Sequence, residues 1–373
     1  MISVIMPVYN AAKFLRESIE SILNQSESNF ELLIVNDGST DNSEEIILSY
    51  SDRRIVYLKK ENGGEASARN MALAHAKGEF IVFQDADDVS LPNRLSVLLS
   101  QFTSDNIGFV HSDMALIDER GKPVGYWQSR QIDKNRVLRH LIKIGTPFNN
   151  SSMMIRKKLL EKYQYDTGLK VGTDTAMVAN FAVSCDSVHV NLPLLLYRRH
   201  SNNISKQSDY EVLFSHVRKL FERFSLKELV PELNWEEKKK SEIKAKSIIS
   251  LFLSRRKMGI DADAWFKDAA KCQAEYGDED LKNFVYVLAH LAVGDINQAF
   301  QLLTSCREQD HIIQNYLGEI YALAGNPEQA KKHFMNALQV NPNYEEPIEN
   351  LKALGCAAGF NIIDTSWLKF IKI

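Results

Sequence analysis

The sequence predicts an α/β domain with a mainly parallel sheet and flanking helices, followed by an all-α region. In the first half of the chain, short apolar runs alternate with stretches whose apolar residues recur at helical spacing. Such alternation indicates right-handed βαβ units and a buried parallel sheet. From about Lys206 onward the strand signals stop and helical spacing dominates. The expected domains are therefore residues 1–205, a helical connection over 206–246, and a helical domain over 247–373.

Four apolar runs near the N-terminus predict the first strands. They are ISVIM (2–6), ELLIVN (31–36), RIVYLK (54–59) and FIVFQ (80–84). Helical spacing follows the first run as far as Leu23, with Asn10 as the expected N-cap. Further helices are expected up to Tyr50 and from Ala66 to Ala76. Each pair of neighbouring strands is thus separated by a helix, as a parallel sheet requires.

Beyond residue 88 the alternation loosens, and several shorter elements are expected. HSDMALID and PVGYW flank the turn ERGK, which predicts a hairpin. NNSSMMIRKKLL predicts a strand that enters a helix, and VHVNLPLLLYRRH predicts two short strands. Three helices are expected in this part. The first is started by Ser90 and Pro92 and ends at Leu99, and the second runs from Val137 to Ile144. The third runs from Asp174 to Ser184, with Thr173 as its N-cap.

The composition is that of an ordinary globular protein, with 45% hydrophobic and 25% charged residues. A net charge of -3 gives no reason to expect nucleic acid as the main partner. The four cysteines lie far apart and form no CxxC pair, which argues against a zinc site and favours a reducing cytoplasm. The N-terminal MISVIMPVYN lacks a basic flank, so no signal peptide is expected. No apolar run approaches the roughly 18 residues of a membrane span.

Polar residues gather where the predicted strands end, and the run FIVFQDADD (80–88) is the densest case. Ligands of open α/β sheets bind beyond the carboxyl ends of the strands, so these positions predict a site. They are Asn10, Asp37, Asn62 and Asp85 to Asp88. A lone Asp after a strand is usually a turn or a cap, but three carboxylates without a basic neighbour repel one another. A divalent cation with hard oxygen ligands, Mg²⁺ or Mn²⁺, would resolve that repulsion.

The C-terminal half carries a repeated helical pattern. LGEIYALAGNPEQAKKHFMNALQVNP (317–342) matches the tetratricopeptide pattern, and GDINQA (294–299) repeats the spacing of GNPEQA within it. A fainter third copy surrounds Gly259, so two or three such repeats are expected. The charge run EEKKKSEIKAK (236–246) predicts a solvated helix face or a connection between domains. The tail FNIIDTSWLKFIKI (360–373) is expected either to cap the last repeat or to contact a membrane surface.

Several stretches together resemble the family 2 glycosyltransferases, which have the Rossmann-like GT-A fold. They are SVIMPVYN, LLIVNDGSTDNS, NGGEASARNMALAHAKGEFIVFQDADD and YRRHSNNIS, in the usual order over about residues 1–205. The resemblance implies transfer of a hexose from a nucleotide sugar, with UDP as the expected nucleotide, by single displacement with inversion. It also implies a divalent metal, Mn²⁺ or Mg²⁺, and a saccharide or lipid-linked acceptor in surface polysaccharide synthesis.

The resemblance assigns roles to individual residues. The expected nucleotide-sugar contacts are Pro7, Val8, Tyr9, Asn10, Asp37, Asn62, Arg69, Asp85, Ala86, Asp87, Arg198 and Arg199. The expected metal ligands are Asp87, Asp88 and His200, and Asp174 is the expected catalytic base. Thr173 stands where the family often has Glu, which puts the acceptor side in doubt. The helix dipole is expected to hold the pKa of Asp174 low.

Other classes fit less well. A sugar-phosphate nucleotidyltransferase needs a glycine-rich, basic loop after the first strand, and a Rossmann dehydrogenase needs GxGxxG there. The loop PVYNAAKFL offers neither. A catalytically inactive scaffold that binds partners through its helical repeats remains an alternative, although inactive copies typically lose the acidic motif or the base. The expected location is the cytoplasm, with peripheral contact at the inner face of the cell membrane as an open alternative. Self-association or a protein partner is expected to use the repeats.

Overall fold

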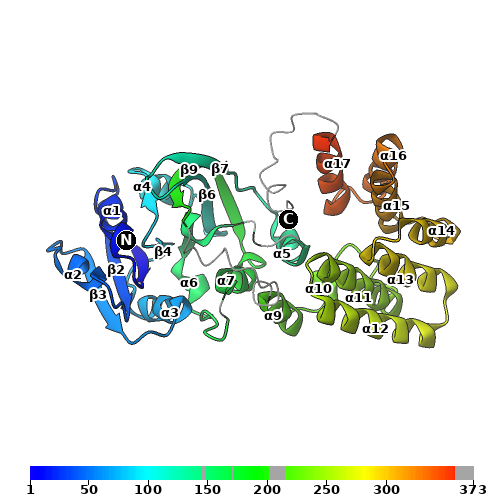
Figure 1. The fold of residues 1–373 in the computed structure, drawn as a ribbon, viewed down its shortest axis with the longest axis horizontal. Helices are drawn as coiled ribbons and strands as arrows, with labels where there is room; N and C mark the ends of the chain where they lie inside the picture. The colour runs from blue at the N-terminus through cyan, green and yellow to red at the C-terminus, as the bar shows by residue number, and fades with distance from the viewer. Residues whose placement is uncertain (144–145, 147, 170, 201–214, 358–373) are drawn as a thin grey trace. The chain divides into compact units, whose positions relative to one another are not determined.

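The computed structural model describes residues 1–143, 146, 148–169, 171–200 and 215–357. The chain forms two compact units, Met1–Leu220 and Phe221–Ile373 (Figure 1). Among the described residues, every strand belongs to the first unit. The second unit is helical, as the sequence predicts. The predicted boundaries at 205 and 246 stay a proposal.

The first half of the sheet is parallel. It contains β1 (Ile2–Val8), β2 (Phe30–Asp37), β3 (Ile55–Lys60) and β4 (Phe80–Phe83), in the spatial order β3-β2-β1-β4. Buried aliphatic side chains occupy the middle of these strands, for example Val4, Leu32 and Val82. Because the strands are parallel and in register, Asp37 after β2 and the acidic residues after β4 emerge at the same edge of the sheet.

The second half of the sheet is mixed. It contains β5 (Val89–Ser90), β6 (Ile107–Ile117), β7 (Pro123–Trp127), β8 (Met153–Arg156) and β9 (Asp186–Arg198). β8 pairs antiparallel with β4 and β6, whereas β6 and β9 are parallel. The predicted hairpin is β6 and β7. The two short strands predicted over 188–200 are instead one strand, β9, because it follows β6 through several register shifts.

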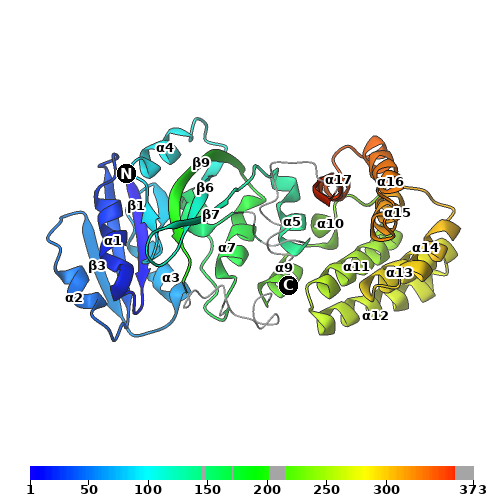
Figure 2. The same ribbon diagram turned by 45° about the horizontal axis from the view of Figure 1, so that its top comes forward.

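Helices flank the sheet (Figures 1 and 2). They are α1 (Ala12–Leu23), α2 (Ser43–Leu48), α3 (Glu65–His75), α4 (Arg94–Ser100), α6 (Lys157–Leu160) and α7 (Thr173–Ala182). α5 (Val137–Lys143) packs on α7, and α9 (Ser215–Arg223) contains the boundary between the two units. The predicted Asn10 cap of α1 is wrong, since Ala11 occupies that position. Residues at the start of α2 accept hydrogen bonds from the backbone at the start of α1. Ala12 N donates to Asp41 Oδ2 and Ala11 N donates to Ser43 Oγ, each at 3.0 Å.

The second unit consists of consecutive helices that pack in pairs. They are α10 (Leu226–Leu229), α11 (Lys238–Arg255), α12 (Gly259–Tyr276), α13 (Glu279–Ala292), α14 (Ile296–Ser305), α15 (His311–Leu323), α16 (Pro327–Val340) and α17 (Glu345–Ala357). α11 packs on α12, α13 on α14, and α15 on α16. Such pairs are compatible with the predicted tetratricopeptide-like repeats, which stay a prediction.

The charge run at 236–246 is exposed at its start, from residue 236 to 239, but its later part also has a buried side. It starts α11, whose Ile243 and Ala245 are buried. Lys244 is also buried, and its ammonium contacts Glu308 at 3.1 Å and Asp310 at 2.9 Å. Two carboxylates therefore satisfy the one lysine that the helix turns inward.

The predicted tail 360–373 lies outside the described residues. Within the described part of the chain, none of the helices combines the length and apolar character needed to cross a membrane.

Candidate active site

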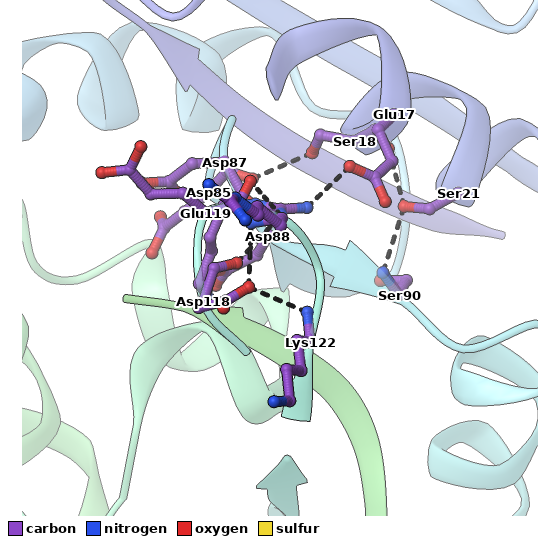
Figure 3. A network of polar contacts seen from close by, with 12 residues as sticks. Glu17, Ser18, Ser21, Asp85, Asp87, Asp88, Ser90, Asp118, Glu119 and Lys122 are labelled. Carbon is purple, nitrogen blue, oxygen red and sulfur yellow. Dashed lines mark hydrogen bonds and ion pairs between the residues drawn. The ribbon is translucent and has the colours of Figure 1, made fainter. Parts of the chain in front are cut away.

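The acidic loop, Asp85 to Asp88, follows β4 closely and is held at Asp85 by two serine side chains. Ser18 Oγ on α1 donates to the carbonyl of Asp85 at 2.9 Å, and Ser151 Oγ donates to its Oδ2 at 2.6 Å. Figure 3 shows the loop between α1, which carries Ser18, and the turn that carries Asp118. These contacts fix the loop from outside because its own carboxylates cannot stabilise one another.

Asp87 and Asp88 are anchored by the end of β9. His200 Nε2 lies 2.7 Å from Asp87 Oδ2, and Arg198 N donates to Asp88 Oδ1 at 2.9 Å. Burial and repulsion from Asp85 raise the pKa of Asp87, although His200 opposes the shift. Burial, with the negative charges of Asp85 and Asp87, raises the pKa of Asp88 well above its usual range. Burial and mutual repulsion therefore outweigh the opposing effects of His200 on Asp87 and of Arg94 on Asp88.

Arg198 holds the acidic loop in place through its backbone and its side chain. Its side chain is buried, and Nε donates to the carbonyl of Asp87 at 2.8 Å. Nη2 pairs with Glu17 Oε2 at 2.6 Å, and the guanidinium lies over the Phe14 ring. These contacts hold the guanidinium on several sides, and its predicted contact with the diphosphate stays a prediction. Arg199 is exposed, and its predicted phosphate contact stays open.

Arg69 on α3 is the centre of a second charged group. Its guanidinium forms ion pairs with Asp174 at the start of α7, with Glu65 at 2.6 Å and with Asp85 at 3.4 Å. It is buried, and the rings of Phe83 and Tyr165 lie 5.5 and 5.4 Å from its Cζ. The sequence predicts Arg69 near the nucleotide, whereas here it joins the acidic loop to the predicted base.

Asp174 lies at the start of α7, but two details differ from the sequence-based expectation. The N-cap is Gly172, not Thr173. A glycine suits this position because the chain adopts a φ of 74° there and a Cβ would fall on the His216 ring. The pKa of Asp174 is raised rather than low, because burial outweighs the ion pair with Arg69. The raised pKa makes Asp174 a stronger base than an exposed aspartate.

Asp37, at the end of β2, is buried and already accepts several hydrogen bonds. Lys60 Nζ lies 2.5 Å from Oδ1, and Gly63 N donates to the same oxygen at 3.0 Å. Gly64 N donates to Oδ2 at 2.8 Å. Asn62 Nδ2 donates to the Asp37 carbonyl at 3.1 Å. The two predicted nucleotide contacts Asp37 and Asn62 therefore lie in one hydrogen-bonded group.

The segment after β1 closes the same edge of the sheet. Asn10 adopts a φ of 49°, and its Oδ1 accepts a hydrogen bond from Thr40 N at 2.8 Å. Tyr9 is 54% exposed although it is a large aromatic residue. Pro7 and Val8 are the last residues of β1, and Val8 is buried. The parallel register places the ends of β1, β2 and β4 next to one another, so the predicted site residues of the first 90 positions share one edge.

Comparisons with known proteins identify the family of this chain. The sequence model of the family described as "Glycosyl transferase family 2" matches residues 3–164. Glycosyltransferase GlyG of Streptococcus pneumoniae is 31% identical over 241 residues, which cover 61% of this chain and 79% of GlyG. The chain belongs to the family 2 glycosyltransferases.

Other relatives of this family 2 member match shorter segments. WfgD of Escherichia coli, a UDP-Glc:alpha-D-GlcNAc-diphosphoundecaprenol beta-1,3-glucosyltransferase, is 37% identical over 141 residues, covering 38% of this chain and 56% of that protein. An uncharacterized glycosyltransferase of Rickettsia bellii is 43% identical over 122 residues, 32% of this chain and 18% of that protein.

The crystal structure of S. aureus TarS 1-349 in complex with UDP-GlcNAc aligns with a TM-score of 0.53 at 18% identity, covering 96% and 92% of the two chains. This likeness shows the GT-A fold.

The acidic loop of this family 2 member suits a divalent cation. In the described residues, no group of three or more His, Cys, Asp and Glu side chains already forms a metal site. Asp88 Oδ2, however, is buried and has no hydrogen-bond partner among the described residues. A cation beside Asp87 and Asp88 would supply that partner and offset the repulsion that raises both pKa values. The predicted ligand His200 adjoins Asp87 through its Nε2.

The structure adds residues that sequence reasoning missed. Glu65 stands four positions before Arg69 on one helix, and this i,i+4 spacing was a readable signal. Ser151 contacts Asp85 across 66 residues, and Glu17 contacts Arg198 across 181. No local sequence pattern predicts contacts between residues so far apart in the chain.

Proposed function

We propose that this chain is a metal-dependent inverting glycosyltransferase that moves a sugar from a UDP-sugar to a hydroxyl of a saccharide or lipid-linked acceptor in surface polysaccharide synthesis. The arrangement around Arg69 carries the proposal, because one buried guanidinium joins Asp85 of the acidic loop to Asp174. A donor-binding carboxylate and a base are thereby held at a fixed separation. Single displacement needs such a pair and no protein nucleophile.

Asp174 is assigned the proton transfer. The acceptor oxygen would attack C1 of the sugar while its proton passes to the Asp174 carboxylate. The bond between C1 and the diphosphate oxygen breaks as the new bond forms, and its electrons leave with the nucleoside diphosphate. Burial raises the pKa of Asp174, which strengthens it as a base. A cation held by Asp87 and Asp88, with His200 as a third expected ligand, would offset the charge of the leaving diphosphate.

Asp37 supports UDP as the nucleotide. Each carboxylate oxygen accepts about two hydrogen bonds. Oδ1 already accepts from Lys60 and Gly63, and Oδ2 accepts from Gly64. One acceptor position therefore remains on Oδ2, which suits the single imide N–H of uracil better than the paired N–H groups of guanine. The name of WfgD, which specifies UDP-Glc, agrees with this choice.

The remaining contacts and partners stay proposals. Pro7, Val8, Tyr9, Asn10 and Asn62 would surround the nucleoside, and Ala86 with Asp87 would face the ribose and diphosphate. The helical unit would bind a partner or a second copy. Cytoplasmic location, with or without peripheral contact at the inner face of the membrane, stays a prediction.

The function is tested by donor turnover. The purified full chain is incubated with UDP-glucose, UDP-galactose, UDP-N-acetylglucosamine or GDP-mannose, each with Mn²⁺ or with EDTA, and the released nucleotide is measured. We expect release from at least one UDP-sugar with Mn²⁺ and none with EDTA. Binding of UDP without any turnover would favour the inactive scaffold, and equal turnover in EDTA would remove the metal from the proposal.

A further inference from the structure

Glu65 forms an ion pair with Arg69 on the same helix, and its carboxylate also lies near the predicted base Asp174. It is the first residue of α3, after Gly64 with a φ of 84°, and its side chain is 37% exposed. Its carboxylate lies 2.6 Å from Nη2 of Arg69, whose own side chain is only 2% exposed. One end of this ion pair is thus fixed inside the protein, while the other end is only partly covered.

The exposed end lies beside the base. Arg69 Nη1 pairs with Asp174, whose side chain is 35% exposed, while Nη2 pairs with Glu65. Both nitrogens belong to one planar guanidinium, which the rings of Phe83 and Tyr165 hold in place. The two carboxylates therefore meet at one buried cation, and each of them is partly exposed.

Charge in this group is unbalanced. Arg69 faces Asp174, Glu65 and Asp85, so one positive charge meets three carboxylates. The groups that act on Glu65 are Arg69, Asp174, Asp85 and Asp87. Burial and the repulsion from the three aspartates, opposed by Arg69, raise the pKa of Glu65 to about 7. A ligand that donates a hydrogen bond would relieve this excess negative charge.

We propose that Glu65 is a catalytic residue on the acceptor side, where it binds the attacking hydroxyl together with Asp174 and shares the proton that the hydroxyl loses. The inference rests on the proposed function and names a residue that sequence reasoning did not assign. In the step, the acceptor O–H bond breaks and its proton moves into the Glu65–Asp174 pair. The acceptor oxygen bonds to C1, and the nucleoside diphosphate leaves with the electrons of the C1–O bond.

A purely structural Glu65 would act only through Arg69, and Glu65→Gln separates the two roles. The amide oxygen of Gln still accepts a hydrogen bond from Arg69, but the side chain no longer takes a proton. Glu65→Asp keeps the charge on a shorter side chain. Glu61→Gln is the matched control, because Glu61 is exposed and precedes the same helix.

The experiment measures three quantities on the full-length variants, using the donor that the wild-type chain turns over, with Mn²⁺ and water as the attacking hydroxyl. Calorimetry gives the UDP affinity, and UDP release gives the rate and its pH profile. We expect Glu65→Gln to lower the rate by about 10²-fold, the low end of the contribution of a positioned base. UDP affinity should stay within about twofold, a free-energy change below about 0.5 kcal/mol. The acid limb of the profile should move to lower pH, since Asp174 loses a repelling neighbour, and Glu65→Asp should recover part of the rate.

Rates and pH profiles equal to those of Glu61→Gln would overturn the proposal. A rate loss matched by an equal loss of UDP affinity would also overturn it, because Glu65 would then act through donor binding or folding. If the wild-type chain turns over no donor, the proposed function itself fails, and that result is seen before any variant is compared.

Discussion

His200 Nε2 lies 2.7 Å from Asp87 Oδ2 and joins the end of β9 to the acidic loop after β4. Two residues earlier on β9, Arg198 N donates to Asp88 Oδ1. One strand therefore holds both carboxylates that we assign to the metal. Asp88 Oδ2 remains buried and has no hydrogen-bond partner among the described residues. The position of Asp88 is therefore fixed by protein contacts, and its buried oxygen is expected to affect the stability of the fold.

The first prediction concerns Asp88→Asn, which removes the buried charge. Because the pKa of Asp88 is raised in the folded protein, the folded state binds a proton that the unfolded state has lost. The stability contributed by this group is therefore highest near the ordinary carboxyl range and falls as pH rises through the raised pKa. Without metal, the variant should melt several degrees above wild type at pH 8, and the difference should shrink toward pH 5. Scanning calorimetry at both pH values measures it.

Mn²⁺ should reverse the order of the two melting temperatures, because a cation stabilises the ionised Asp88 of the wild type. We expect Mn²⁺ to raise the melting temperature of wild type at pH 8 and to leave that of Asp88→Asn nearly unchanged. Asp105→Asn is the control, since its side chain is 98% exposed. A variant that melts below wild type at pH 8 without metal would show that the buried charge is not a cost.

The second prediction concerns Asp37→Ala and donor binding. The carboxylate lies at the end of β2 with one open acceptor position, so its loss should weaken UDP affinity by about 1–3 kcal/mol, the cost of an unpaired buried partner. Titration calorimetry measures the affinity. An unchanged UDP affinity would place the nucleoside elsewhere.

Lys60→Met sharpens this test, because it frees a position on Asp37 Oδ1 without removing the carboxylate. The preference for UDP over GDP should narrow, since Asp37 can then accept a second N–H group. A preference for UDP over GDP as large as that of wild type would show that Lys60 does not determine which nucleobase binds.

The N-terminal half of the fold was predictable from the sequence because its signals are local. A buried parallel strand is a continuous apolar run, and Val4, Leu32 and Val82 lie in such runs. The acidic loop could be located for the same reason, since Asp85 to Asp88 follow a strand directly. The GT-A fold class is confirmed, and the hairpin formed by β6 and β7 was also predicted.

The rest depended on contacts between distant segments. The ion pair between Arg198 and Glu17 joins residues 181 positions apart, so the sequence could not report it. The pKa of Asp174 was expected to be low from the helix N-terminus alone, whereas burial among α3 and the acidic loop raises it. Burial is a property of the assembled fold, and no spacing in the sequence reports it.

The third prediction concerns the packing of α15 against α16. A Cβ added at Gly318 would fall on the ring of Phe334, which is buried. Gly318→Ala should therefore destabilise the helical unit by about 1–3 kcal/mol through overpacking. Urea denaturation followed by circular dichroism measures the change. Gly259→Ala is the control, since a Cβ at that helical position meets no atom within 4 Å. Equal stability of both variants would show that the ring moves aside without cost.

The last prediction concerns Asp174→Asn, which keeps size and hydrogen-bonding capacity but removes proton affinity. If Asp174 takes the acceptor proton, turnover should fall by about 10²–10⁴-fold, the usual contribution of a positioned acid or base. The amide oxygen still accepts a hydrogen bond from Arg69, so Arg69 should keep its place and UDP affinity should barely change. Turnover and UDP affinity are measured on the same variant, and Asp166→Asn, a partly exposed aspartate before α7, serves as the control. Turnover near that of wild type would reject Asp174 as the base. A loss of UDP affinity would instead assign it to holding Arg69 for the donor, because Arg69 also contacts Asp85 of the acidic loop.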